Sequence, residues 1–488
     1  MEVVIGIMGP RSPPARRIER PVDRKRSRCR TGVVGRWPGL EFGWSLPTFW
    51  EAGLHAVPGC GSPRLDRLVG HVPPAIATLP TTEICMQRRA LETVRPGDVL
   101  GRTIYDDVGR PLLTAGTELN DRYLRSLAVR GYYALDIQDG LADDVAPRDL
   151  ISHRVRATVT SHVADVFGRV EQVASDRGRG EGSVDDAIDD LGEQPLPIPE
   201  AEDLLGRLYL DVETLIDEIL ESSTVEGLDS LKTHSRYTFE HSVDVAVVGT
   251  LIGARLGMSR ERLRELALGC LLHDIGKIYI DAAILDKPGK LTAEEFAAVK
   301  EHPRMGFELA RRMPVTSLLP AHVAYQHHER QRGGGYPRGL IGRNRVGARL
   351  NAEEVGAGKM LLIAEIGAVA DVHSALSSDR PYRGAMPPDE VAAELAAMAG
   401  NHLNQELIAV LRQLLPPFPV GRWVRALDGR FGGYQGVVVE LHPRELERPT
   451  VRWLLDEVGD ELADPVEFDM RREVDVSLRC TELAPALV

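Results

Sequence analysis

Apolar residues between Glu200 and Leu415 recur mostly at spacings of three and four. One such run contains Leu204, Leu205, Leu208, Val212, Leu215, Ile216 and Ile219. This spacing places apolar side chains on one face of an α-helix. The pattern therefore predicts an all-α domain over residues 200–415, with one helix beginning near Thr238 and another apolar helical run over Leu263–Leu272.

The segment before this domain follows a different pattern. Strand-like runs cover Val99–Tyr105, Pro111–Ala115 and Tyr132–Ile137, and Asn120 is placed to cap a helix that runs to Arg130. These runs predict a small α+β module over residues 86–140. Residues 141–199 are expected to contain a helix, over 148–175, and then a flexible linker in the Gly- and Asp-rich stretch 176–199.

The two ends of the chain also differ from the helical domain. Residues 1–85 are rich in Pro, Gly and Arg, which predicts a disordered tail and leaves open whether Met86 is the true start. After three prolines at 416–419, strand-like runs cover Trp423–Ala426, Gly436–Leu441 and Thr450–Leu455. They predict a small β module over 420–483, so the fold class is a central helical domain with a small module on each side.

Composition and charge limit the function classes. Of the 488 residues, 43% are hydrophobic and 27% are charged, as in globular proteins. The net charge of −13 argues against a chain-wide nucleic-acid surface. The five cysteines show no CxxC spacing, so we expect neither a zinc ribbon nor a disulfide framework, and a cytoplasmic location. The longest apolar run, Met360–Ala370, is too short to span a membrane, and no secretory signal is apparent.

Histidines are concentrated in the predicted helical domain. Nine of the fourteen lie between His234 and His402. His273 and Asp274 follow the apolar run Leu263–Leu272 directly. A buried ionised carboxylate is costly unless it is paired, and a divalent cation stabilises it; an aspartate can also bridge two ions through its two oxygens. The pair therefore indicates a metal site.

Further motifs follow in a fixed order. They are His302-Pro303 with Gly306, His327-His328-Glu329, Gly333-Gly334-Gly335-Tyr336-Pro337, Ala370-Asp371 and Asp379-Arg380-Pro381-Tyr382-Arg383. Together with His241 and the run His273-Asp274-Ile-Gly276-Lys277, this set resembles the HD-GYP family over about 185 residues. The modules at 86–140 and after Val420 are similar to ones that often precede and follow such domains.

The resemblance implies a metal-dependent phosphodiesterase with two divalent ions, Fe or Mn, held by imidazoles and carboxylates. The implied ligands are His241, His273, Asp274, His302, His327, His328 and Asp371, with Asp274 bridging. Some family members hold a third ion through a glutamate one turn before the first histidine. Tyr237 stands at that position, and Glu240 is poorly placed to replace it, so we predict two ions.

Other residues are candidates for binding the substrate. Lys277, four residues after His273, would lie on the same helical face and hold a phosphate oxygen or a metal-bound water. The glycine-rich turn through Gly335 would let the backbone approach a ligand, with Tyr336 stacking on a base and Pro337 fixing the turn. Arg380 and Arg383 suit phosphate contacts, because a guanidinium binds two oxygens at once. A solvated lysine and surface arginines are the alternatives.

Four features depart from the family pattern. Arg332 stands where an aspartate is common, Glu365 where an arginine is common, and Ser374 where a second aspartate is usual. The segment Arg343–Lys359 is longer than usual. The reversed charge of Glu365 would remove an ion pair or repel an anionic substrate, with slow or lost turnover as the consequence.

Three hypotheses remain open at this point. The first is hydrolysis of cyclic di-GMP to pGpG, and onward to GMP, in bacterial second-messenger signalling. The second is a degenerate HD-GYP domain that works as a sensor or scaffold. The third is an HD-type phosphohydrolase that acts on another nucleotide. Signalling partners at the flanking modules and a homodimer are left open, while a specific nucleic acid and a membrane are not expected as partners.

Overall fold

The computed structural model describes residues 86–481, except 107–109, 133, 139, 141–144, 146–148, 177–183, 199, 223–236, 288, 315–316, 351–357, 379–383 and 474. The tail expected over residues 1–85 lies outside the described residues. So do Arg380 and Arg383, the two arginines expected to contact phosphate.

The central region is helical, as its apolar spacing predicts. Its α-helices are α5 (Ala201–Glu221), α6 (Tyr237–Arg255), α7 (Arg260–Leu272), α8 (Ala282–Leu285), α9 (Ala293–Val299), α10 (His302–Ala310), α11 (Leu319–Gln326), α12 (Leu362–Ser377), α13 (Pro388–Met398) and α14 (Gln405–Arg412). Short 3-10 helices, η3 (Ile275–Tyr279) and η4 (Gly347–Leu350), follow α7 and precede α12. The seven apolar residues that define the run on α5 are all buried.

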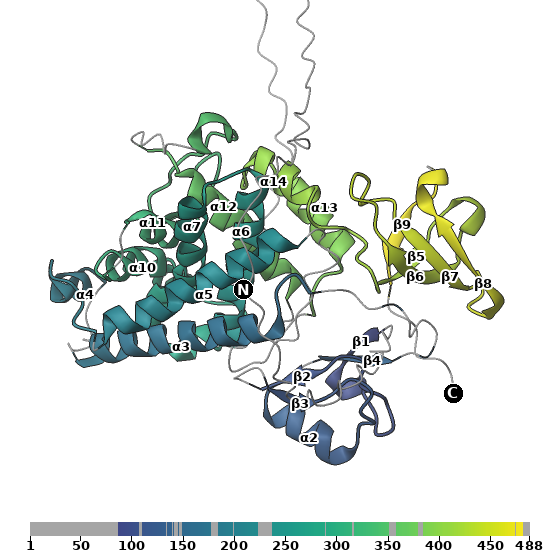
Figure 1. Cartoon of the computed structure of the whole chain (residues 1–488). Coiled ribbons are helices and arrows are strands. Elements are labelled where there is room, and N and C mark those ends of the chain that lie inside the picture. Colours follow the sequence, from purple (N-terminus) through teal and green to yellow (C-terminus); the bar gives the residue numbers. More distant parts are fainter. Residues whose placement is uncertain are drawn as a thin grey trace, which may run out of the picture. The chain divides into compact units, whose positions relative to one another are not determined.

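Helix α12 lies at the centre of this domain. Almost every residue from Leu362 to Leu376 is buried, as expected of a helix that is apolar all round. It packs against α6 and α11, and α7 packs against α6 and α11 in turn (Figure 1). Among the residues that the structure describes, no helix is both long and apolar enough to cross a membrane.

In its described residues, the N-terminal module contains two small antiparallel sheets, one α-helix and the 3-10 helix η1 (Leu91–Thr93). Strand β1 (Met86–Ala90) pairs with β4 (Ala134–Gln138), and β2 (Ile104–Tyr105) pairs with β3 (Pro111–Leu113). Helix α2 (Asp121–Val129) is capped by the Asn120 side chain, which accepts a hydrogen bond from the Tyr123 N–H, as predicted. The strands are shorter than expected, and β1 was not predicted.

Two helices precede the central domain. The helix predicted over 148–175 is α3 (His153–Asp176), which packs along α5. The expectation of a flexible linker is wrong for part of 176–199, because α4 (Val184–Leu191) forms there. An ion pair and a hydrogen bond join this segment to residues at and just beyond α10: Arg304 contacts the Asp185 carboxylate at 2.5 Å, and Arg312 Nε donates to the Gly192 carbonyl at 2.6 Å.

The C-terminal module is an antiparallel sheet in the order β8-β7-β6-β5-β9. Its strands are β5 (Trp423–Ala426), β6 (Gln435–Glu440), β7 (Thr450–Leu455), β8 (Glu461–Asp469) and β9 (Leu478–Cys480). The first three match the predicted strands within one residue. Edge strands β8 and β9 were missed, because β8 is largely exposed and contains Pro465, and β9 is very short.

Candidate metal centre

The structure brings all seven predicted ligands together. His241 lies on α6, His273 and Asp274 directly follow α7, His302 begins α10, His327 and His328 follow α11, and Asp371 lies in α12. They form three overlapping groups in which one donor atom per residue lies within 4.8 Å of the others: His241 with His273 and Asp371; His273 with Asp274 and His327; and His302 with His327 and His328.

Cluster one consists of His241, His273 and Asp371. The Nε2 atom of His241 lies 3.1 Å from Oδ1 of Asp371, and the ring centroids of His241 and His273 are 5.3 Å apart. All three residues are buried. Two imidazoles and a carboxylate thus converge from α6, the end of α7 and α12.

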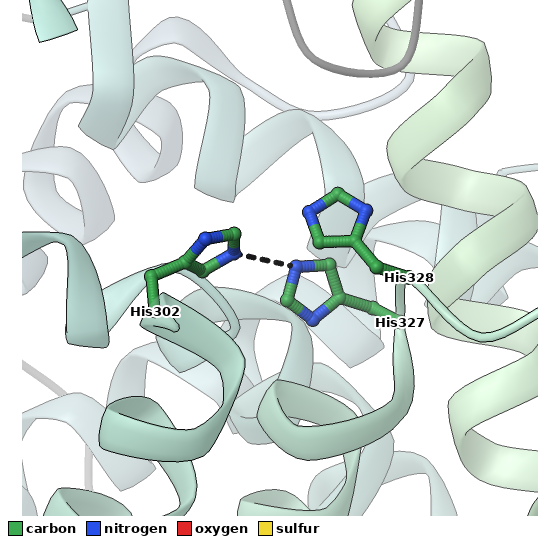
Figure 2. A group of neighbouring side chains, drawn as sticks. All are labelled: His302, His327 and His328. Carbon is green, nitrogen blue, oxygen red and sulfur yellow. Dashed lines mark hydrogen bonds between the residues drawn. The ribbon is translucent and has the colours of Figure 1, made fainter. Parts of the chain in front are cut away.

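Cluster two consists of His302, His327 and His328, shown in Figure 2. The Nε2 atoms of His302 and His327 face each other at 3.2 Å. Each of these rings uses its Nδ1–H for a backbone carbonyl, Val299 O at 2.7 Å and Ala324 O at 2.8 Å respectively. In neutral rings both facing Nε2 atoms would therefore carry lone pairs, an arrangement that a shared cation satisfies.

Asp274 lies between the two clusters. Its Oδ1 atom is 3.5 Å from His302 Nε2 and 3.9 Å from His327 Nε2. Its Oδ2 atom is 3.3 Å from His273 Nε2 and 2.8 Å from Lys277 Nζ. Because each oxygen faces a different cluster, the carboxylate fits the bridging position between two cations.

Burial favours the metal-binding protonation state of the three histidines of cluster two, and neighbouring charges favour that of Asp274. Burial lowers the pKa of His302 and His328 well below the usual range and that of His327 to about 4, so these imidazoles are neutral at neutral pH. Burial alone would raise the pKa of Asp274, but His273 and Lys277 outweigh it and hold this pKa well below its usual value. Neutral imidazoles and ionised carboxylates are the ligating forms.

A close approach of two backbones positions the ligands around Asp274. A Cβ atom on Gly276 would lie 2.0 Å from the His302 carbonyl oxygen and 2.5 Å from the Gly306 nitrogen. Only glycine therefore lets η3 pack directly against the first turn of α10. This packing brings His302 beside Asp274.

Comparison with known proteins agrees with this geometry. Residues 228–350 match the family model described as an HD domain. This part of the chain is an HD domain. The chain is 36% identical to a cyclic di-GMP phosphodiesterase of Pseudomonas aeruginosa over 49% of this chain and 54% of that protein. It is 34% identical to 3'3'-cGAMP-specific phosphodiesterase 3 of Vibrio cholerae, over 47% of this chain and 45% of that protein.

A third relative is the cyclic di-GMP phosphodiesterase response regulator RpfG of Xanthomonas campestris. It is 38% identical over 34% of this chain and 40% of that protein. The chain thus spans about half, or less, of the length of the curated relatives it matches. These relatives confirm the resemblance to the HD-GYP family that the motif order predicted.

Lys277 is placed differently from the sequence prediction. The α-helix ends at Leu272, and the chain continues as η3, so Lys277 does not share a helical face with His273. Its ammonium group instead lies 2.8 Å from Oδ2 of Asp274. In the HD domain this lysine therefore contacts the carboxylate that separates the two clusters.

The glycine-rich turn packs against the HD domain's own backbone. A Cβ on Gly335 would lie 2.5 Å from the His328 carbonyl oxygen, which explains the glycine without a ligand. The centroid of the Tyr336 ring lies 4.7 Å from that of the His328 ring, with the two planes tilted by 30°. Tyr336 is only partly exposed, and the Tyr336–Pro337 peptide bond is cis. The turn thus places Tyr336 directly beside cluster two.

Glu329 was missed as a positioning residue for this turn. Its buried carboxylate accepts hydrogen bonds from the backbone N–H groups of Arg338 at 2.7 Å and Leu340 at 2.8 Å. Glu329 belongs to the motif His327-His328-Glu329, but only the structure shows the hydrogen bonds that its carboxylate accepts. The carboxylate ties the turn to the segment that carries His327 and His328.

Glu365 does not act as an unpaired reversed charge. Its Oε1 atom lies 3.0 Å from Nη2 of Arg349, and its Oε2 atom accepts a hydrogen bond from Asn404 Nδ2 at 2.5 Å. Both charged side chains are buried. The arginine comes from the long segment Arg343–Lys359, so the segment supplies the partner that the reversed charge requires.

Glu240 has a charged neighbour outside the seven predicted ligands. With Asp244 it lies near Arg156 of α3, whose guanidinium contacts Asp244 Oδ1 at 2.5 Å. Burial would lower the pKa of Arg156, but Asp244, and to a smaller extent Glu240, outweigh it and raise this pKa. The environment of Glu240 is therefore an ion-pair network between α3 and α6.

Proposed function

We propose that this chain is a metal-dependent phosphodiesterase that hydrolyses a cyclic dinucleotide, with cyclic di-GMP as the preferred substrate and pGpG as the first product. The observation that carries the proposal is the position of Asp274, with one carboxylate oxygen toward each of two histidine clusters. The relatives named as cyclic di-GMP and 3'3'-cGAMP phosphodiesterases support the substrate class.

The donor set fits two divalent ions, for which we propose Fe or Mn. It consists of imidazole nitrogens and carboxylate oxygens, with no thiolate among the seven residues. One ion would be held by His241, His273 and Asp371, the other by His302, His327 and His328, and both by Asp274. Two such ions supply Lewis acidity, which activates water and offsets the charge that develops on the phosphodiester.

The protein's own residues would orient the substrate around this centre. Lys277 neutralises part of the Asp274 charge and is only partly buried, so its ammonium group can also reach a phosphate oxygen. Tyr336, held against His328, offers the edge of an aromatic platform to a base. Arg380 and Arg383 keep their expected role as phosphate contacts.

The structure weakens the argument for a catalytically inactive sensor. The main argument for it was the reversed charge of Glu365, and that charge is neutralised by Arg349. We propose a cytoplasmic enzyme, with the flanking modules as the sites for signalling partners. Arg332, the other departure that favours a sensor, is exposed.

A substrate panel tests the proposed function. The purified chain, loaded anaerobically with Fe or Mn, would be incubated with cyclic di-GMP, 3'3'-cGAMP and GTP, and the products separated by chromatography. We expect linear dinucleotides from the cyclic substrates, with cyclic di-GMP hydrolysed fastest. Binding of both metals without any turnover would reject the enzyme and favour a sensor, and faster turnover of GTP would favour an HD phosphohydrolase of another specificity.

A further inference from the structure

His241 is held differently from His273, the other histidine of cluster one, and from His302 and His327 of cluster two. His273, His302 and His327 each donate their Nδ1–H to a backbone carbonyl three residues earlier in the chain. The Nδ1 atom of His241 instead lies 2.9 Å from the hydroxyl oxygen of Ser374. A side chain from another helix therefore sets the ring orientation.

Helix α12 contacts both nitrogens of this ring. Asp371 Oδ1 lies 3.1 Å from His241 Nε2, and Ser374, one turn later on the same face, lies beside Nδ1. Ser374 is 2% exposed and His241 is 5% exposed, so water does not replace the hydroxyl readily. The hydrogen bond is part of a buried arrangement in which α12 fixes the imidazole of α6.

The Ser374 hydroxyl can support the tautomer of His241 that binds a cation through Nε2. A neutral imidazole that donates its Nε2 lone pair carries its proton on Nδ1, and that N–H needs a buried acceptor. The Ser374 oxygen is such an acceptor. In the family that the chain resembles, an aspartate is usual at this position. Its carboxylate is a charged and stronger acceptor, which makes the imidazole a more basic ligand.

We propose that Ser374 is a positioning residue that orients His241 for metal binding and gives cluster one a weaker metal affinity than an aspartate would. The inference rests on the proposed function, because it assumes that His241 is a ligand. The role would distinguish the two ions, because the Ser374 hydroxyl lies beside a proposed ligand of cluster one, whereas His302 and His327 of cluster two face each other.

Metal titration of the full-length apoprotein tests this role without relying on activity. Mn²⁺ would be titrated against a competing chelator, which resolves two binding steps. Ser374→Ala is expected to weaken one step about tenfold and leave the other unchanged, because the loss of an outer-sphere partner costs about 10- to 100-fold in affinity. Ser374→Thr should restore the wild-type value, and Ser374→Asp should bind more tightly than the wild type.

A matched control lies on the same helix. The Ser377 hydroxyl donates to the His373 carbonyl at 2.8 Å, so Ser377→Ala removes a helical hydroxyl without touching a proposed ligand, and it should leave both steps unchanged. Circular dichroism of each apoprotein checks that the fold persists. Equal affinities for the wild type and Ser374→Ala would overturn this inference alone, whereas a wild type that takes up no metal would overturn the proposed function with it.

Discussion

At the residue scale, burial and neighbouring charges shift the pKa values of the side chains in the metal centre away from their values in water. Four of the five histidines, His241, His302, His327 and His328, have a lowered pKa, chiefly because burial disfavours the imidazolium form. For His273, burial acts in the same direction, but Asp274 outweighs it and raises the pKa. The four histidines with a lowered pKa thus favour the neutral form that binds a cation, whereas the raised pKa of His273 opposes binding, because a cation displaces its proton.

These shifts predict how the stability of the metal-free protein depends on pH. In the unfolded chain the histidines titrate near pH 6.5, so between about pH 6.5 and 4 the unfolded state binds more protons at the four lowered positions. The free energy of unfolding should therefore fall on acidification through this window, with up to about 3 kcal/mol from His327 alone. His273 opposes this fall in stability, because its raised pKa means that the folded state binds the proton more tightly than the unfolded state does.

Urea unfolding of the apoprotein at several pH values measures this effect. Far-UV circular dichroism is the suitable signal, because the two described tryptophans, Trp423 and Trp453, both lie in the C-terminal sheet. His327→Gln should reduce the slope with pH. A free energy of unfolding that is constant, or that rises on acidification, would contradict the account of these shifts.

At the element scale, the centre depends on a few contacts that join segments distant in sequence. Arg349 and Glu365 form one of them, because they connect the segment before α12 to α12 itself, and Asn404 adds the start of α14. Replacing Glu365 with Arg would bury two guanidinium groups without a carboxylate to offset their charge, although Arg349 would keep its bonds to backbone carbonyls. We expect a loss of at least about 3 kcal/mol in the free energy of unfolding.

A double variant in which the two residues are exchanged separates the energy of their interaction from the effects of the individual side chains. Arg349→Glu combined with Glu365→Arg should recover part of the loss, and urea unfolding of the single and double variants gives the coupling energy. Glu447→Arg is the exposed comparison, beside Arg412, and should change stability by less than about 1 kcal/mol. If Glu365→Arg were no more destabilising than Glu447→Arg, the buried pair would not have the structural role assigned here.

The packing of η3 against α10 gives a second prediction at this scale. In Gly276→Ala the added methyl would meet backbone atoms of His302 and Gly306, so the two segments must separate. We expect a loss of about 1 to 3 kcal/mol in stability and weakened metal binding, measured by urea unfolding and by metal content. Gly306→Ala is the matched comparison, since its methyl would first meet Ala324 Cβ at 3.3 Å. Equal effects of both changes would contradict the packing argument.

At the scale of the whole molecule, the helical domain could be predicted from the sequence, because apolar residues three and four positions apart indicate a helix without any information about distant contacts. The ligand residues followed from the order of the motifs in the chain. The contact between Ser374 and His241 could not be predicted, because 133 positions separate the two residues and only the packing of α12 on α6 joins them. Helix α4 was missed for a similar reason, since its ion pair with α10 joins Asp185 to Arg304, which lies 119 positions later in the chain.

The most direct test of the metal phosphodiesterase is the comparison of wild type with Asp274→Asn. The change keeps the size of the side chain but removes the charge that faces both clusters, whereas Asp464→Asn, on the exposed strand β8, is the control. Metal content and cyclic di-GMP hydrolysis would be measured on the same samples. We predict two ions and turnover in the wild type and the control, and turnover reduced at least about a hundredfold in Asp274→Asn, with less than two ions retained. Undiminished turnover in Asp274→Asn would contradict the central claim.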